Sequence, residues 1–114
     1  MQLQNKNTYF TDNVFAKIIR NEIPCKKVLE NAHALAFHDI NPQNIVHILV
    51  IPKGPYIDFH HFYSTATPEE ILSFHTLIID ILAHCKDGKL ESNFGYFQEI
   101  PHFHIHLKAD KWFE

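Results

Sequence analysis

The stretch PHFHIHLK at residues 101–108 places three histidines at every second position, with bulky apolar residues between them. Successive side chains of a β-strand point to opposite faces, so His102, His104 and His106 are predicted to line one face of a strand over about 13 Å. The alternating apolar residues are predicted to face the core. The pattern therefore predicts a strand that is anchored by one side and presents three imidazoles on the other.

Three neighbouring imidazoles disfavour one another's protonation, which predicts a cluster that is largely neutral at pH 7. Neutral imidazoles serve as metal ligands, or as a nucleophile with hydrogen-bond donors beside it. A His-x-His pair on a strand occurs in zinc sites, but His102 and His106 are predicted to lie too far apart to share one ion easily along a flat strand. Zinc binding by this cluster is therefore an open alternative that the spacing does not favour.

The composition predicts one globular domain. The chain has 114 residues, of which 46% are hydrophobic and 20% are charged, enough for a single core. We expect a flexible N-terminal segment at residues 1–12 and a single domain at 13–114. The formal net charge of -3 offers no broad basic surface, so no nucleic-acid partner is expected.

Apolar runs and cysteines indicate the compartment. The longest apolar run is far shorter than the roughly 20 residues that span a bilayer, so no membrane partner is expected. The polar N-terminus has no apolar segment typical of a signal peptide. Cys25 and Cys85 lie far apart in the sequence and are interpreted as reduced, which favours a cytoplasmic protein.

Two helices are predicted, one short and one long. The short helix covers residues 14–21 and is capped by Asp12 or Asn13. The long helix begins at Thr67, because TPEE at 67–70 combines an N-cap, a proline at the first helical position and a capping box. It is predicted to run to residue 85, with Gly88 as a left-handed cap beyond it. Its apolar face is predicted to comprise Ile71, Leu72, His75, Leu77, Ile78, Ile79 and Leu82.

Strands are predicted at 26–31, 33–40, 45–52, 89–93 and 102–108. Strand 45–52 is almost entirely apolar and β-branched, which is typical of a strand buried on both faces. The connector at 53–67 is expected to contain a helical turn. This order predicts an α+β fold with a mostly antiparallel sheet of about five strands, and the long helix on one face of that sheet.

HFHIHLK at 102–108 resembles the His-φ-His-φ-His-φ-φ signature of the histidine triad (HIT) superfamily, in which φ is apolar; Lys108 departs from it at the last position. FAKIIRNEIPCKKVLEN at 15–31 is similar to the N-terminal block of that family. ALAFHDINPQNIVHILVIPK at 34–53 is similar to its nucleoside-binding strand pair. The resemblance is closest to the Hint-like branch of small homodimeric nucleotide phosphoramidases and nucleotide-binding proteins.

The resemblance implies a covalent mechanism. His104 matches the nucleophile, which attacks the α-phosphorus of a purine nucleoside 5′-phosphoramidate or a related nucleoside monophosphate derivative and forms a nucleotidylyl-histidine. His102 and His106 match the flanking histidines that contact the phosphate or the leaving group. His47 matches a fourth histidine on an adjacent strand, although a core histidine would explain the same position. The resemblance implies that no cofactor is required.

The resemblance also implies a nucleoside site. Asp39 matches the acidic residue that binds both ribose hydroxyls, with a turn residue as the alternative. The base is expected against Phe37, Ile40 and either Ile19 or Phe15, of which Phe15 is better interpreted as core. The loop before the triad matches the family's phosphate-contacting loop at Asn93, Gly95 and Gln98.

Two regions depart from the family pattern. The loop at 93–99 is about two residues short, and Glu99 stands where small hydroxyl residues are common, which puts its phosphate contacts in doubt. The C-terminal tail lacks the family's Gly-Gly turn, and Trp112 and Phe113 are expected either to pack across a dimer interface or to cap the core. Three alternatives follow: a nucleotide-binding regulatory HIT protein with little turnover, a dinucleoside polyphosphate hydrolase and a metal-binding protein. A homodimer with a sheet extended across its two-fold axis is expected.

Overall fold

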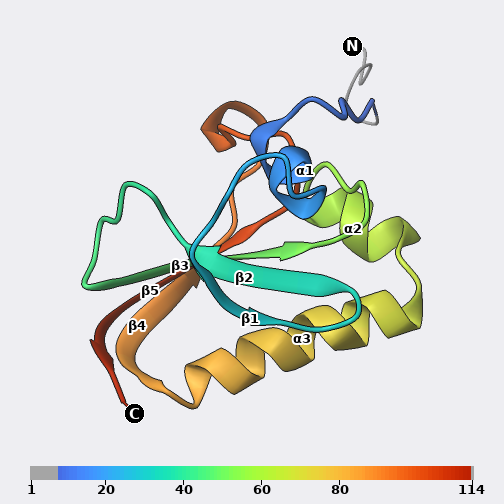
Figure 1. The fold of residues 1–114 in the computed structure, drawn as a ribbon. Coiled ribbons are helices and arrows are strands. Elements are labelled where there is room, and N and C mark those ends of the chain that lie inside the picture. The colour runs from blue at the N-terminus through green and yellow to red at the C-terminus, as the bar shows by residue number, and fades with distance from the viewer. Residues whose placement is uncertain (1–7, 114) are drawn as a thin grey trace.

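A computed structural model describes residues 8–113. It contains one five-stranded antiparallel sheet with strand order β1-β2-β3-β5-β4, and α1 and α3 lie against opposite faces (Figure 1). The α+β class and the antiparallel sheet are as predicted. The elements are α1 (Val14–Ile19), β1 (Lys27–Glu30), β2 (Ala34–His38), β3 (Val46–Pro52), α2 (Phe59–Thr65), α3 (Pro68–Leu82), β4 (Cys85–Glu91), a 3-10 turn (Gly95–Phe97) and β5 (Ile105–Trp112).

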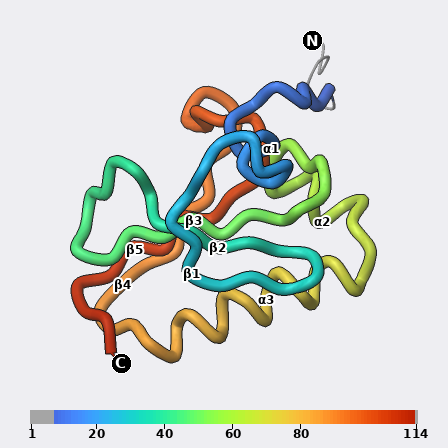
Figure 2. The backbone as a smooth tube through the Cα atoms, in the orientation of Figure 1, coloured from blue at the N-terminus to red at the C-terminus, as the bar shows by residue number. Residues whose placement is uncertain are grey.

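Strand β3 lies at the centre of the sheet, and the backbone trace shows it between β2 and β5 (Figure 2). All seven of its residues are buried, which confirms the prediction of a strand covered on both faces. One side packs against α2 and α3 through Ile48 and Val50, and the other packs against α1 through Leu49 and Ile51. Side chains on the α1 face of β3 and β5 are therefore the ones that surround the histidines.

Helix α1 begins at the predicted place. The side chain of Asn13 accepts a hydrogen bond from the backbone N–H of Ala16, so Asn13 is the N-cap rather than Asp12. Phe15 and Ile18 are buried against the sheet. The helix is only six residues long, so these apolar contacts hold it in place rather than its own backbone hydrogen bonds.

Helix α3 has the predicted capping box between Thr67 and Glu70, but its buried face is rotated from the predicted one. The buried residues are Phe74, Leu77, Ile78 and Ile81, whereas Leu72, His75, Ile79 and Leu82 are exposed. Apolar residues lie on more than one side of this helix, so two different stripes of residues with helical spacing could each form the buried face. Phe74 decides between them, because it reaches Phe62 and Phe103 in the core.

The segment after α3 differs from the prediction. The helix ends at Leu82, and Gly88 lies inside β4 instead of capping the helix. A Cβ atom at Gly88 would lie 2.4 Å from the backbone oxygen of Lys108, so the glycine permits close pairing of β4 with β5. Strand β4 begins at Cys85, four residues before the predicted start at residue 89.

The histidine strand also begins at a different residue. β5 starts at Ile105, so His102 and His104 precede it, and the prediction of a regular strand from 102 was wrong. The β3–β5 register continues toward Pro52 opposite Phe103, and proline has no N–H to donate to the ladder. The alternation of faces survives, because Phe103, Ile105 and Leu107 all join the core beneath α3.

The connector at 53–67 contains the seven-residue helix α2, which is longer than the predicted helical turn. Asp58 caps it by accepting a hydrogen bond from the backbone N–H of His61. Its Phe62 is fully buried and stacks on Phe103. The helix therefore fixes the start of the segment that carries His102 and His104.

Candidate active site

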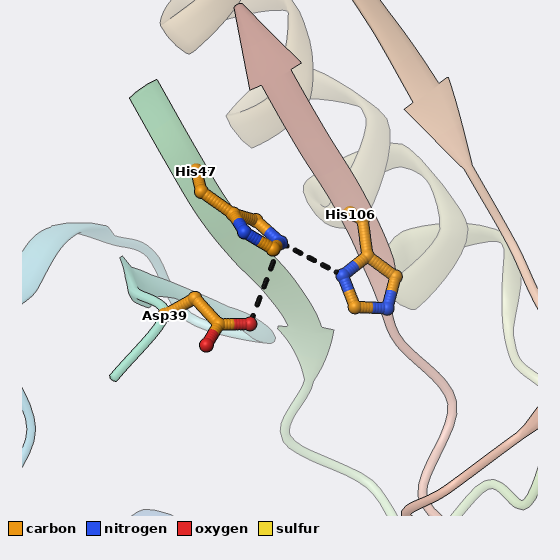
Figure 3. Close-up of side chains that lie close together, drawn as sticks. All are labelled: Asp39, His47 and His106. Atoms are coloured by element: carbon orange, nitrogen blue, oxygen red, sulfur yellow. Dashed lines mark hydrogen bonds and ion pairs between the residues drawn. The ribbon is translucent and has the colours of Figure 1, made fainter. Parts of the chain in front are cut away.

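Five predicted site residues meet on the face of the sheet that carries α1. Asp39 follows β2, His47 lies on β3, and His106 lies on β5 (Figure 3). His104 lies beside His106, with ring centroids 5.0 Å apart. His102 lies deeper, and the carbonyl oxygen of its backbone is 2.7 Å from the Nδ1 atom of His104. The structure thus places all four predicted catalytic histidines and Asp39 in one continuous cluster.

The tautomer of His104 is determined by its backbone partner. A carbonyl oxygen only accepts hydrogen bonds, so Nδ1 of His104 carries the proton and donates it to the His102 carbonyl. The lone pair of the neutral ring is therefore on Nε2. Phe15 packs edge-on to this imidazole with ring centroids 5.0 Å apart, and His104 is only 5% exposed. His104 is therefore held as a neutral ring with one defined tautomer.

His47 and His106 form a hydrogen-bonded chain. The backbone N–H of Gln43 donates to Nδ1 of His47, so the proton of that ring is on Nε2. This atom lies 3.0 Å from Nδ1 of His106 and 3.4 Å from a carboxylate oxygen of Asp39. His106 accepts at Nδ1, so its own proton is on Nε2, the nitrogen that points away from His47 in Figure 3. The Nε2–H of His106 is therefore a hydrogen-bond donor that points away from His47.

His102 is fully buried and has both ring nitrogens occupied. Nε2 lies 2.8 Å from the carbonyl oxygen of Pro52 and donates to it. Nδ1 therefore accepts, and the hydroxyl of Tyr9 donates to it over 2.6 Å. Since neither nitrogen is free, His102 supports the site rather than presenting an atom to a ligand.

Burial keeps the histidines neutral. It lowers the pKa of His102 to about 4, and the hydrogen bond to Pro52 offsets this only in part. Burial also lowers the pKa of His104, and neighbouring His106 lowers it further. The pKa of His106 falls because of burial and then because of His47 and Lys108, while burial lowers the pKa of His47 against the opposing effect of Asp39. The predicted neutral cluster follows, with burial rather than mutual repulsion as the main cause.

The side chains of Asp39, His47 and His106 also lie close enough together to resemble the ligands of a metal ion. One ligand atom from each lies within 4.8 Å of the others. A metal at Nε2 of His47 would require the ring proton to move to Nδ1, where the backbone N–H of Gln43 already points. The donor set therefore fits a chain of hydrogen bonds better than it fits zinc.

The predicted base-binding residues differ in their access to a ligand. Ile40 is 91% exposed beside Asp39 and is available to an aromatic base. Phe37 and Phe15 are buried and contact each other, so both belong to the apolar core on the α1 face. Ile19 packs against the same apolar cluster from α1 while keeping part of its surface exposed.

The loop before the triad is partly anchored. The side-chain amide of Gln98 donates to the backbone oxygen of Ile57 at 2.6 Å, which ties the loop to the start of α2. Asn93 is half-buried at the end of β4. Glu99 lies near enough to His104 for its charge to raise the pKa of that imidazole slightly against the effect of burial. Among the described residues, neither Asn93 nor Gln98 has a side-chain hydrogen bond to a histidine of the cluster.

Several contributors to the site were not predicted. Tyr9 lies in the N-terminal segment that was expected to be flexible, and no pattern in that polar stretch indicates its contact with His102. Gln43 acts through its backbone, which no side-chain motif reveals. Lys108 was identified only as a departure from the apolar pattern, and its ammonium group contacts Gln43 and Glu91.

Comparison with known proteins identifies the family. The HIT domain family model matches residues 20–111. An uncharacterized 13.2 kDa HIT-like protein of Azospirillum brasilense is 50% identical over 110 residues, covering 91% of this chain and 90% of that protein. A histidine triad protein from Clostridium difficile superposes with a TM-score of 0.76 at 32% identity, covering 94% of this chain and 97% of that one. A HIT family hydrolase from Clostridium thermocellum superposes with a TM-score of 0.70 at 28% identity, covering 88% and 91%.

This chain belongs to the HIT family, as predicted, and its five-stranded α+β architecture is the HIT fold. The matched region contains Asp39, His47 and the complete triad. Among residues 8–113, no helix has the length and apolarity needed to cross a membrane.

The buried histidines predict a loss of stability in mild acid. The pKa of His102 is about 4 in the folded protein and 6.5 when unperturbed, so between these values the unfolded state binds a proton that the folded state does not. The free energy of unfolding should therefore fall as the pH drops, by about 2 kcal/mol between about pH 7.5 and pH 5 from this residue alone. Urea denaturation at the two pH values measures the change. The His102→Asn variant should lose about 2 kcal/mol of this pH dependence, and an unchanged dependence would contradict the assignment.

Proposed function

We propose that this protein is a HIT hydrolase of the Hint-like branch. It acts on purine nucleoside 5′-phosphoramidates or related nucleoside monophosphate derivatives. The observation that carries the proposal is the tautomer of His104, which leaves an unprotonated Nε2 on a neutral, oriented imidazole. A neutral imidazole is a competent nucleophile at pH 7, and a covalent intermediate divides one difficult displacement into two easier steps.

In the proposed reaction Nε2 of His104 attacks the α-phosphorus. The bond to the leaving group breaks, its electron pair departs with the leaving group, and a nucleotidylyl-histidine remains. Water then cleaves the N–P bond, which releases the nucleoside monophosphate and restores His104. In this proposal the Nε2–H of His106 donates a hydrogen bond to a phosphoryl oxygen or the leaving group, which the tautomer of His106 supports.

The proposed reaction requires no metal or other cofactor. The hydrogen-bonded chain of Gln43, His47 and His106 supplies a fixed N–H donor in place of a Lewis acid. Such donors are effective in a buried site because they need no reorganisation during the reaction. Zinc at the cluster would have to displace the proton between His47 and His106, which the backbone of Gln43 opposes.

The nucleophile is tested by adenosine 5′-phosphoramidate hydrolysis in wild type and in His104→Ala. We expect turnover in the wild type and a loss of at least about 10³-fold in the variant, because the variant lacks the proposed nucleophile. AMP should still bind to the variant, as measured by calorimetry. His60→Ala, which changes an exposed histidine on α2, serves as the control and should retain full activity.

A second candidate function is a nucleotide-binding regulatory protein with little turnover. The specific observation that favours it is Glu99, whose carboxylate lies near His104 in a loop expected to contact phosphate. Intact AMP binding without turnover in the wild-type protein would support this alternative. Turnover of a dinucleoside polyphosphate at a higher kcat/KM than the phosphoramidate would instead support the branch that hydrolyses those compounds.

The proposed ribose contact is tested by Asp39→Asn. A carboxylate accepts two hydrogen bonds from a vicinal diol, whereas the amide provides one acceptor and one donor group, so AMP affinity should fall about 10-fold. The affinity for 2′,3′-dideoxy-AMP should change by less than about twofold, because that ligand lacks both hydroxyls. Equal losses for both nucleotides would show that Asp39 acts through His47 instead.

We infer that the protein forms a homodimer through β4 and α3. β4 is an edge strand, and a groove between it and α3 is lined by Ile79, Leu82 and Leu90. These apolar side chains are exposed in the single chain, with Ile79 at 64%. An exposed apolar stripe beside an unpaired strand edge fits a second copy arranged about a two-fold axis, with the sheet continued across it. The exposed Trp112 at the end of β5 is consistent with the predicted packing across this interface rather than with a core cap.

The dimer is tested by size exclusion with light scattering at micromolar concentration. The wild type should elute with twice the mass of one chain, and Ile79→Asp should shift the protein to the monomer by placing a charge in the apolar stripe. Leu29→Asp, which changes an exposed leucine on the opposite edge strand β1, should leave the mass unchanged. A monomeric wild type would refute the dimer.

A further inference from the structure

Tyr9 makes a contact that the proposed chemistry does not use. Its hydroxyl donates to Nδ1 of His102 over 2.6 Å, and the two rings meet edge to face with centroids 5.6 Å apart. The hydroxyl must be the donor, because Nε2 of His102 holds the ring proton and gives it to the carbonyl of Pro52. Burial raises the pKa of Tyr9, so the donor stays protonated at neutral pH. A fully buried imidazole thus takes one of its two hydrogen bonds from the N-terminal segment.

The segment that carries Tyr9 is tied to α1 and runs along the same end of the molecule (Figure 1). Asn13 caps α1 with its side-chain oxygen and donates from its side-chain nitrogen to the carbonyl of Phe10 at 2.8 Å. Arg20 donates to the carbonyl of Thr11 at 2.7 Å. These bonds close the turn before the helix and hold Tyr9 over His102. The helix cap and the tyrosine contact are therefore parts of one local structure.

His102 connects Tyr9 to the nucleophile. The backbone carbonyl of His102 accepts the Nδ1 proton of His104, and this bond determines which nitrogen of His104 is nucleophilic. Phe15 packs edge-on against both imidazoles and closes the space between them. A His102 ring held at both nitrogens keeps its backbone in place, and displacement of the ring would move the carbonyl away from His104.

We propose that Tyr9 is a positioning residue for the nucleophile His104, acting through His102, and that residues 8–13 belong to the structure that orients the active site. The inference rests on the proposed function for its kinetic consequence. Its structural consequence rests on geometry alone: the contact between Tyr9 and His102 helps to keep His104 in a single tautomer.

The test compares Tyr9→Phe with a matched control. Tyr63→Phe removes a hydroxyl from a second tyrosine–histidine pair of the same 2.6 Å length, which joins Tyr63 to His75 outside the site. The rate of nucleotidylyl-histidine formation from adenosine 5′-phosphoramidate in a single turnover should fall about 3- to 10-fold in Tyr9→Phe, the range for one lost hydrogen bond. The affinity for AMP should stay within about twofold, and Tyr63→Phe should match the wild type.

A second variant separates positioning from the loss of one hydroxyl. Asn13→Asp keeps an oxygen to cap α1, removes the N–H group that donates to Phe10, and offers the nearby Tyr9 hydroxyl a carboxylate that competes with His102 as its acceptor. This variant should reproduce the slower covalent step of Tyr9→Phe. Its thermal unfolding midpoint should stay close to the wild-type value, because α1 keeps its cap. An Asn13→Asp variant that reacts at the wild-type rate would overturn the role of residues 8–13.

Nitrogen-15 NMR of labelled histidine provides a readout that does not depend on turnover. The wild-type spectrum should show one ring with the proton on Nδ1, assigned to His104 by its loss in His104→Ala. In Tyr9→Phe the Nδ1 signal of His102 should lose its hydrogen-bond shift, and the His104 signals should broaden or divide between tautomers. Unchanged His104 signals, a covalent step within twofold of wild type, or an equal loss in Tyr63→Phe would each overturn the proposal. If the wild type shows no turnover, the proposed function fails, and the spectra alone decide the role of Tyr9.

Discussion

The hydrogen bond from Nδ1 of His104 to the backbone carbonyl of His102 is the interaction on which the site depends. It joins two triad residues through the main chain, so its geometry is set by the path of residues 102–104 rather than by two mobile side chains. That path is irregular because Pro52 cannot extend the ladder with β5. The carbonyl of His102, which precedes β5, accepts the Nδ1 proton of His104, so a side chain satisfies this buried acceptor.

The same principle fixes the other histidines. Two further imidazoles have a nitrogen whose role follows from a backbone partner that only donates or only accepts: the carbonyl of Pro52 for His102 and the N–H of Gln43 for His47. The tautomer of His106 then follows from that of His47. Backbone groups do not change protonation state, so the tautomers they impose hold over a wide pH range. Burial adds to this by lowering the histidine pKa values, and a loss of stability in mild acid is the expected physical consequence of keeping these rings neutral.

Periodicity predicted the elements whose cause is local. The capping box at Thr67 and the apolar run of β3 each depend on neighbouring residues, and both appear where the pattern places them. The errors arose where a distant residue decides. Gly88 is needed for the approach of Lys108, and the buried stripe of α3 is selected by Phe62 and Phe103. The triad histidines could be predicted from spacing, and His47 from the family resemblance. Tyr9 could not, because its contact with His102 joins residues 93 positions apart, and the contact of Gln43 could not, because a backbone N–H has no side-chain signature.

Lys108 shows how this chain tolerates its departure from the apolar pattern of the triad. It lies opposite His47 in the β3–β5 ladder and therefore shares the face of the histidines, where an unpaired ammonium group would be costly. Glu91 on β4 and the side-chain oxygen of Gln43 both contact its nitrogen, so the charge is paired and hydrogen-bonded. The contact with Gln43 also holds the loop whose backbone N–H fixes His47. A substitution that breaks the family pattern is thereby joined to the same chain of hydrogen bonds that orients His106, and its charge adds to burial in lowering the pKa of that histidine.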